Sequence, residues 1–131
     1  MGESIDIRTY SPLTLAFMGD AVFELIVREK IVREADRAVD TLHKHKAEIV
    51  NATAQARMAE RLMDHLTEDE MAVFKRGRNA KTKYTAKHAD VVDYRKATGL
   101  EALYGYLYLT GQKERMDEIT AIIIESGEEN G

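Results

Sequence analysis

The groups in this chain that could carry out chemistry are two acidic residues in apolar, helix-forming stretches and a basic segment between them. Asp20 stands in the first apolar stretch, and Glu101 stands in another, much later in the chain. Two carboxylates can hold a hard divalent cation such as Mg²⁺, and a cationic segment can hold a phosphate backbone. The polar residues that open the basic segment are Lys75, Arg76, Arg78, Asn79 and Lys81. The combination predicts metal-dependent cleavage of nucleic acid.

The distribution of charge favours a polyanionic partner more than the total does. The formal net charge is −4, which argues mildly against a nucleic-acid binder because such domains are often basic overall. Residues 75–96, however, hold eight lysines or arginines against two aspartates, while acids dominate from residue 114 onward. Such a segregated field can steer a polyanion to one face. A solvated charged surface explains the same pattern, so both interpretations stay open at this point.

Length and composition limit the function classes. A chain of 131 residues forms one domain with one core, and 44% hydrophobic with 32% charged residues is ordinary for a globular protein. The absence of cysteine excludes disulfides and thiolate zinc sites, in agreement with a reducing cytoplasm. Neither a signal peptide nor an apolar run of about 18 residues is visible. We therefore expect a cytoplasmic protein with no membrane partner.

The apolar spacing predicts an all-α chain. Ser11 and Pro12 suit a helix start, and Thr67 with Glu70 matches a capping box. The helices expected from these signals span residues 12 to about 32, 40 to about 65 with a possible break, 68–76, 90–97, 98–109 and the stretch from Gly111 to about Ser126. Gly77 is expected to end the short helix, residues 77–89 to form a loop, and residues 127–131 to be a frayed tail.

Asp20 is unusual for a mid-helix acid, because neither capping nor the helix dipole accounts for its position. Its helical neighbours include Phe17 and Phe23, so we expect a partly buried carboxylate. A buried acid needs a cation, either a basic side chain or a metal ion. Gly19 beside it costs the helix roughly 1 kcal/mol relative to alanine. That cost indicates close approach of another backbone or of a ligand.

Glu101 has a simpler explanation as well as a chemical one. Thr98 and Glu101 together match a capping box, in which Glu101 would bond back to the amide of Thr98. Gly105, one turn later, would let a neighbouring helix pack close to Glu101. The pairing with Asp20 favours the metal role.

The four histidines show no metal-ligand spacing, and no nucleophile elbow or phosphate-binding glycine loop is present.

Several of these stretches resemble a known family. The stretch around Asp20, LAFMGDAV, resembles the signature helix of the ribonuclease III catalytic domain, and EALYG from Glu101 resembles its second acidic motif. The segment KRGRNAK at 75–81, followed by Tyr94 and Arg95, is similar to the short Mini-ribonuclease III branch. That branch lacks the double-stranded RNA-binding domain, in agreement with the length of this chain.

The resemblance implies a ribonuclease III endonuclease-domain fold over residues 1–131, paired as a homodimer with Phe17 at the interface. It implies hydrolysis of double-stranded RNA to 5′-phosphate and 3′-hydroxyl ends, with 23S ribosomal RNA precursor as the target and a ribosomal protein as a possible helper. Asp20 and Glu101 would be catalytic and hold Mg²⁺, with Mn²⁺ as a possible substitute. The RNA-binding residues would be Lys75, Arg76, Arg78, Asn79 and Lys81.

Two departures from the full-length family keep other functions open. Ala16 and Thr98 replace a glutamate and an aspartate, which leaves two acids rather than four in each site. A catalytically silent RNA-binding dimer on the same fold is therefore an alternative, against which the retained acids argue. A helical protein-interaction module is a third hypothesis. It explains the amphipathic helices but not the cationic segment.

Overall fold

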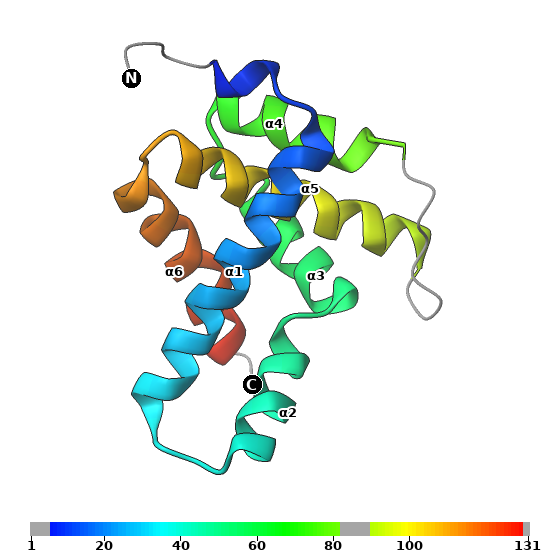
Figure 1. Ribbon diagram of the computed structural model, residues 1–131. Helices are drawn as coiled ribbons and strands as arrows, with labels where there is room; N and C mark the ends of the chain where they lie inside the picture. The colour runs from blue at the N-terminus through cyan, green and yellow to red at the C-terminus, as the bar shows by residue number, and fades with distance from the viewer. Residues whose placement is uncertain (1–5, 82–89, 130–131) are drawn as a thin grey trace.

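The computed structural model describes residues 6–81 and 90–129, which form helices and contain no strand (Figure 1). The all-α prediction is therefore confirmed. In chain order the elements are η1 (Ile7–Thr9), α1 (Pro12–Glu34), α2 (Val39–Ile49), α3 (Ala52–Leu62), α4 (Glu68–Asn79), α5 (Val91–Leu109) and α6 (Lys113–Glu129). None of the helices in these two ranges is long and apolar enough to cross a membrane.

Helix α5 occupies the centre of the fold and contacts α1, α3, α4 and α6 (Figure 1). From Ala97 to Leu107 every residue except Glu101 is buried. A helix that is apolar on all sides is stable only when other helices surround it, and here they do. Glu101 is consequently a carboxylate on the most enclosed helix of the protein.

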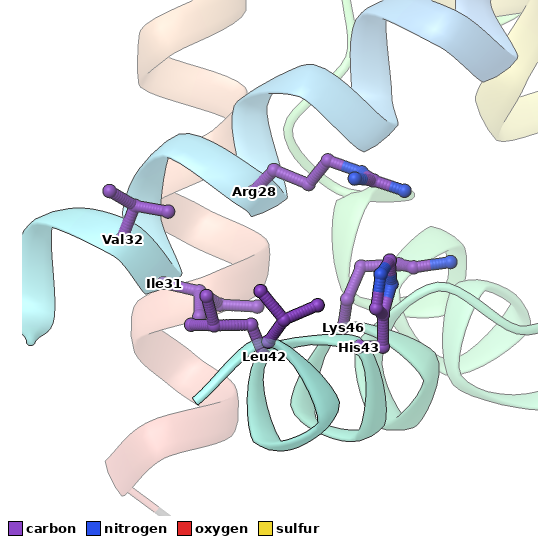
Figure 2. A pocket seen from close by; sticks show the side chains of 7 residues that line it. Arg28, Ile31, Val32, Leu42, His43 and Lys46 are labelled. Carbon is purple, nitrogen blue, oxygen red and sulfur yellow. The ribbon is translucent and has the colours of Figure 1, made fainter. Parts of the chain in front are cut away.

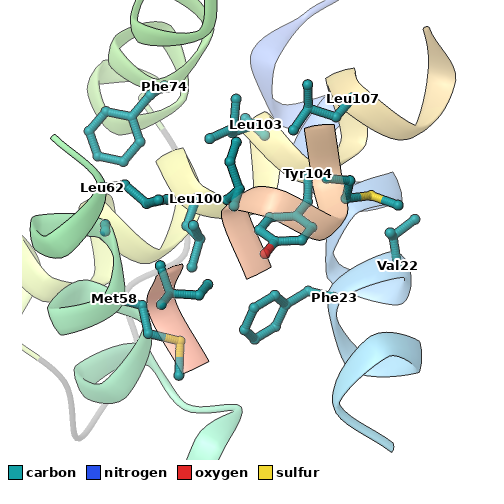
Figure 3. Packing of buried hydrophobic residues seen from close by; sticks show 14 of the residues in the cluster. Val22, Phe23, Met58, Leu62, Phe74, Leu100, Leu103, Tyr104 and Leu107 are labelled. Carbon is teal, nitrogen blue, oxygen red and sulfur yellow. The ribbon is translucent and has the colours of Figure 1, made fainter. Parts of the chain in front are cut away.

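The core packs around an aromatic pair that joins α1 to α5 (Figure 3). The rings of Phe23 and Tyr104 meet edge to face, with centroids 5.2 Å apart. Both side chains are fully buried, and the Tyr104 hydroxyl bonds to Thr120 Oγ1 of α6 at 2.6 Å. The packing of Phe23 and Tyr104 therefore fixes the relative positions of the two helices that carry the candidate acids.

Helix α5 is continuous, whereas the sequence predicted a break at Thr98. The Thr98 hydroxyl donates a 3.0 Å hydrogen bond to the Tyr94 carbonyl, one turn earlier in the same helix. The N-cap of α5 is Asp90, whose side chain accepts from the Val92 amide. The predicted capping box of Thr98 and Glu101 is therefore wrong. Glu101 is not engaged as a cap and is free for another role.

Helix α4 ends at Asn79, so the prediction that Gly77 ends it is wrong. Gly77 instead lies against α5, where a β-carbon would stand 2.8 Å from Ala102 Cβ and 3.0 Å from Gly99 Cα. The glycine serves close helix packing rather than helix termination. The predicted capping box of Thr67 and Glu70 is present at the other end of α4.

The remaining boundaries lie close to the predicted ones. The possible break in the second helical region falls at residues 50–51, between α2 and α3. Gly111, with φ of +70°, turns the chain between α5 and α6 as expected. Helix α6 continues to Glu129, past its predicted end and into the predicted frayed tail. Most of the predicted loop after α4, residues 82–89, lies outside the described residues.

Candidate active site

Helices α1 and α5 touch backbone to backbone where they cross, because each carries a glycine at that point. A β-carbon on Gly19 would overlap the carbonyl oxygen of Glu101. A β-carbon on Gly105 would overlap the carbonyl oxygen of Leu15. The close approach expected from both glycines is therefore present. It brings Asp20, the residue after Gly19, beside Glu101.

The carboxyl groups of Asp20 and Glu101 lie close enough to interact directly. Burial, the negative charge of Asp20 and a hydrogen bond with Asp20 raise the pKa of Glu101 to about 8, while a smaller effect of Gln55 opposes this. Within residues 6–81 and 90–124, no ion pair joins either acid to a basic side chain. Two facing acids without a basic partner form a site that a divalent cation would neutralise.

The donor set fits Mg²⁺ better than a metal that needs a full protein cage. No group of three or more His, Cys, Asp or Glu side chains comes together in the described part of the chain. Ala16 and Thr98, at the positions where the resemblance would place two further acids, are buried, and neither supplies a carboxylate. Mg²⁺ keeps several waters and commonly binds through one or two carboxylates plus substrate phosphate. Asp20 and Glu101 meet that requirement.

Asp20 is exposed, so the prediction that it is partly buried is wrong. The buried stripe of α1 runs through Leu15, Gly19 and Phe23, and Asp20 falls beside it. Phe17, expected to help to bury the acid, is itself 82% exposed. The site is consequently open to solvent on the α1 side and enclosed on the α5 side. An open side is what a polymeric substrate requires.

Helix α3 contributes a polar residue that the sequence analysis did not single out. Gln55 is only 4% exposed, and its amide lies beside Glu101. Its effect on the pKa of Glu101 is a small decrease, which partly offsets the overall increase. Its Nε2 nevertheless has no hydrogen-bond partner. The sequence held a signal, since Gln55 shares one helical face with Met58, Ala59 and Leu62. A glutamine on an otherwise apolar helix face indicates a specific polar contact.

The predicted RNA-binding residues gather at the C-terminal end of α4. Lys75 and Lys81 are exposed there, while the Arg78 Nε donates to Asn79 Oδ1 at 3.2 Å. Arg76 also lies here, but its guanidinium donates to the carbonyls of Arg8 at 2.7 Å and Tyr10 at 2.9 Å. Arg76 therefore has a structural role that the sequence did not predict.

The same residues have a second physical explanation. Cations in the last turn of a helix interact favourably with its dipole whatever their function. The position of the cluster still matters, because Gly77 anchors this end of α4 against Thr98, Gly99 and Ala102 of α5. The basic end of α4 is thus fixed within one helical turn of Glu101 along α5.

Two hollows occur away from the acid pair. One of about 240 Å³ lies between α1 and α2, where Ile31, Val32 and Leu42 meet His43 and Lys46 (Figure 2). Another of about 460 Å³ follows α1, with a largely apolar lining that includes Met18, Leu25 and Tyr108. Neither lining includes Asp20 or Glu101. Because Asp20 is exposed, the acid pair is reached from the protein surface rather than through either of these hollows.

Helices α1 and α5 cross at a pair of glycines, and each helix contributes one acid to the site. Comparison with known proteins identifies the family that has this arrangement. The Ribonuclease III domain family matches residues 13–112. A crystal structure of a Fusobacterium nucleatum protein superposes with a TM-score of 0.84 at 35% identity, covering 95% of this chain and 99% of that one. The chain therefore belongs to the ribonuclease III family of endoribonucleases and has its all-helical domain fold.

Within the family, the similarity is to the short branch. The chain is 48% identical over 123 residues to Mini-ribonuclease 3 of Symbiobacterium thermophilum, covering 92% of this chain and 95% of that protein. It is 43% identical over 126 residues to Mini-ribonuclease 3 of Clostridium tetani, covering 95% and 83%. The Staphylococcus aureus Mini-ribonuclease 3 is 42% identical over 120 residues, covering 90% of each. These matches confirm the resemblance noted in the sequence.

Proposed function

We propose that this protein is a divalent-metal-dependent endoribonuclease that hydrolyses phosphodiester bonds in double-stranded RNA. The observation that carries the proposal is the juxtaposition of Asp20 and Glu101 across the Gly19–Gly105 crossing. The products would carry 5′-phosphate and 3′-hydroxyl ends, as the family resemblance implies. Residues 1–131 would form one catalytic domain.

Asp20 and Glu101 would hold Mg²⁺, or Mn²⁺ in its place. The bound ion would supply stabilisation of the charge that develops on phosphate and would lower the pKa of an attacking water. The raised pKa of Glu101 keeps that acid protonated near neutral pH without metal, so metal binding would displace its proton. Because Asp20 is exposed, a phosphate of a long duplex could reach the pair without entering a pocket.

The basic end of α4 would bind the RNA backbone. Lys75, Arg78 and Lys81 would neutralise phosphates, which positions the duplex without reading its sequence. Asn79 could reach a sugar or base edge in the wide minor groove of A-form RNA. Arg76 would add positive charge to the same surface while holding the η1 segment against α4. Contacts of this kind favour duplex shape over sequence.

The exposed apolar stripe on α1 supports the proposed homodimer. Leu13, Phe17 and Leu25 are 37%, 82% and 66% exposed and recur at intervals of four or eight residues along one helix face. Exposed apolar side chains that recur on one helix face are typical of a protein–protein interface. Phe17 matches the position that packs across the dimer in the family resemblance. Two protomers would then present two acid pairs to one duplex.

The physiological target would be 23S ribosomal RNA precursor in the cytoplasm, with a ribosomal protein as a possible helper. The resemblance to the Mini-ribonuclease III branch supports this target. The surface position of the acid pair also suits a large folded RNA better than a nucleotide-sized substrate. The 23S ribosomal RNA precursor is therefore the substrate to test beside a simple RNA duplex.

The experiment that tests the proposal measures cleavage of a labelled RNA duplex and of the ribosomal precursor, with Mg²⁺ or with EDTA. Asp20→Asn and Glu101→Gln are compared with the wild type. Asp36→Asn and Glu48→Gln are matched controls, because both acids are exposed and lie outside the acid pair. We expect cleavage to need the metal and both site acids, and duplex binding to survive in all four variants.

Other results would point elsewhere. Cleavage that persists in Asp20→Asn and Glu101→Gln would mean that the acid pair is not the active site. Duplex binding by the wild type without cleavage of either RNA would favour the silent RNA-binding dimer, which the missing acids at Ala16 and Thr98 first suggested. Absence of salt-sensitive binding to any duplex would favour a protein-interaction module.

A further inference from the structure

One buried polar side chain stands apart from the others in the described part of the chain. Three polar or charged side chains are buried there, Gln55, Glu70 and Thr98. Glu70 is held by Arg115 and the Thr67 amide, and Thr98 donates to the Tyr94 carbonyl. Gln55 alone among the three leaves a buried donor, Nε2, without a partner. An unsatisfied buried donor destabilises the folded state, so the position of Gln55 calls for an explanation.

Gln55 is held in place by the packing of α3 on α5. Ala56 and Ala59, on the buried side of α3, are both fully enclosed, and such small side chains let two helices approach closely. The amide of Gln55 is thereby brought beside the carboxyl of Glu101, whose pKa it lowers. The unpartnered amide is thus a buried polar group next to the site acid on α5.

We propose that Gln55 is a positioning residue for the active site: its Nε2 donates a hydrogen bond to one oxygen of the ionised Glu101 carboxylate and leaves the other oxygen for the metal. This inference rests on the metal site of the proposed function. The buried amide, without a partner of its own, would thus serve to hold the Glu101 side chain in one orientation.

The chemistry of an amide suits this position better than that of a basic residue. A lysine or arginine beside Glu101 would pair with it permanently, neutralise its charge and compete with the cation. A neutral donor fixes the direction of the carboxylate and leaves the full negative charge for the metal. Partners behind a metal ligand commonly act in this way, and their loss typically lowers metal affinity or activity by 10- to 100-fold.

The test compares Mn²⁺ binding to the full chain by calorimetry for wild type, Gln55→Met and Gln55→Asn. Methionine preserves the length and volume of the side chain without the amide, and asparagine withdraws the amide by one methylene. Gln112→Met is the matched control, because that amide donates only to Thr110 Oγ1 in the turn after α5. Thermal unfolding without metal is measured on each variant, together with the Mn²⁺ dependence of duplex cleavage.

We expect Gln55→Met and Gln55→Asn to bind Mn²⁺ about 10- to 100-fold more weakly. Cleavage should recover at high Mn²⁺ concentration, while unfolding of metal-free Gln55→Met should be unchanged or shifted upward. Gln112→Met should match the wild type.

Wild-type Mn²⁺ affinity in Gln55→Met would overturn the role of Gln55 and leave the proposed function intact. If Gln55→Met fails to fold, Gln55→Asn decides by the same criterion. A wild type that binds no Mn²⁺ would overturn both proposals.

Discussion

Gly105 of α5 lies so close to Gly19 of α1 that a β-carbon on Gly105 would stand 3.1 Å from the Gly19 amide nitrogen. The same β-carbon would overlap the Leu15 carbonyl oxygen. Backbone atoms cannot move aside as the end of a flexible side chain can. The distance between α1 and α5, and with it the distance between the two acids, is therefore set by the absence of two side chains.

Gly105→Ala should accordingly destabilise the protein by more than the roughly 1–3 kcal/mol that is typical of overpacking, because the overlap is with backbone atoms. Gly111→Ala is the control, because its β-carbon meets no atom within 4 Å and the substitution suffers only from the positive φ. That strain is worth about 1–2 kcal/mol. Urea unfolding measures both. A loss at Gly105 no larger than the loss at Gly111 would contradict the close crossing.

The stability of the metal-free protein should fall as the pH rises from about 4.5 to about 8, the ordinary and the folded pKa of Glu101. Between these values the folded protein holds a proton on Glu101 that the unfolded chain has released, so raising the pH favours unfolding. The expected loss is on the order of a few kcal/mol. Urea unfolding in EDTA across this range should show it.

Two comparisons isolate the cause of this pH dependence. Glu101→Gln should flatten the profile, because an amide does not titrate, and Glu48→Gln on the exposed side of α2 should leave it unchanged. Saturating Mg²⁺ should also flatten it by stabilising the ionised acid. An identical slope in wild type and Glu101→Gln would assign the dependence to other groups.

Neutralising the exposed lysines at the end of α4 should weaken RNA binding and make it less sensitive to salt. Lys75→Ala combined with Lys81→Ala would remove the two phosphate contacts proposed for these side chains, so the slope of log affinity against log salt should fall by about 1–2. Duplex binding is measured in EDTA to prevent cleavage. Lys44→Ala, an exposed lysine on α2, is the control. An unchanged slope in the double variant would remove these lysines from the RNA-binding surface.

Arg115→Met should be strongly destabilising, because it leaves the buried Glu70 carboxylate without its cation. Arg115 binds Glu70 through two hydrogen bonds of 2.8 and 2.9 Å, and Glu70 is only 3% exposed. Breaking a buried pair in this way costs about 3–5 kcal/mol. Adding Glu70→Gln should restore much of the loss, as urea unfolding would show. Equal stability of the single and double variants would mean that the unpaired Glu70 carboxylate does not cause the destabilisation.

Phe17→Glu should convert the proposed homodimer into a monomer without unfolding it, because this side chain is already 82% exposed. Sedimentation velocity would report the change in mass, and duplex cleavage should fall with it. Val39→Glu, an exposed apolar position on α2 away from this stripe, is the control and should remain dimeric. A wild type that sediments as a monomer at all concentrations would exclude the dimer.

The sequence predicted the acid pair because its signals are local. A glycine beside Asp20 and another one turn after Glu101 each indicate close packing without knowledge of the partner helix. At other positions the sequence did not reveal which helix a residue packs against in three dimensions. Thr98 followed by Glu101 reads as a capping box, yet packing on all sides of α5 overrides that local preference. Gly77 likewise serves packing rather than termination.

Long-range contacts explain the residues that the sequence analysis misjudged. The partners of Arg76 are the carbonyls of Arg8 and Tyr10, more than sixty positions earlier in the chain. Asp20 was expected to be partly buried because of its aromatic neighbours, but one of them, Phe17, faces solvent. Gln55 gains significance only when α3 is placed against Glu101. Local spacing predicts a helix face but not what that face meets.

The position of Glu101 on the enclosed helix α5 links the lifetime of the site to that of the whole fold. Backbone amides in such a central helix exchange with solvent only when the entire domain opens, whereas ends and loops exchange through small fluctuations. The crossing at Gly19 and Gly105 therefore cannot loosen locally while the rest of the protein stays folded. Mild heating or denaturant should reduce the number of folded molecules that can cleave RNA. Each molecule that remains folded should retain its full turnover rate.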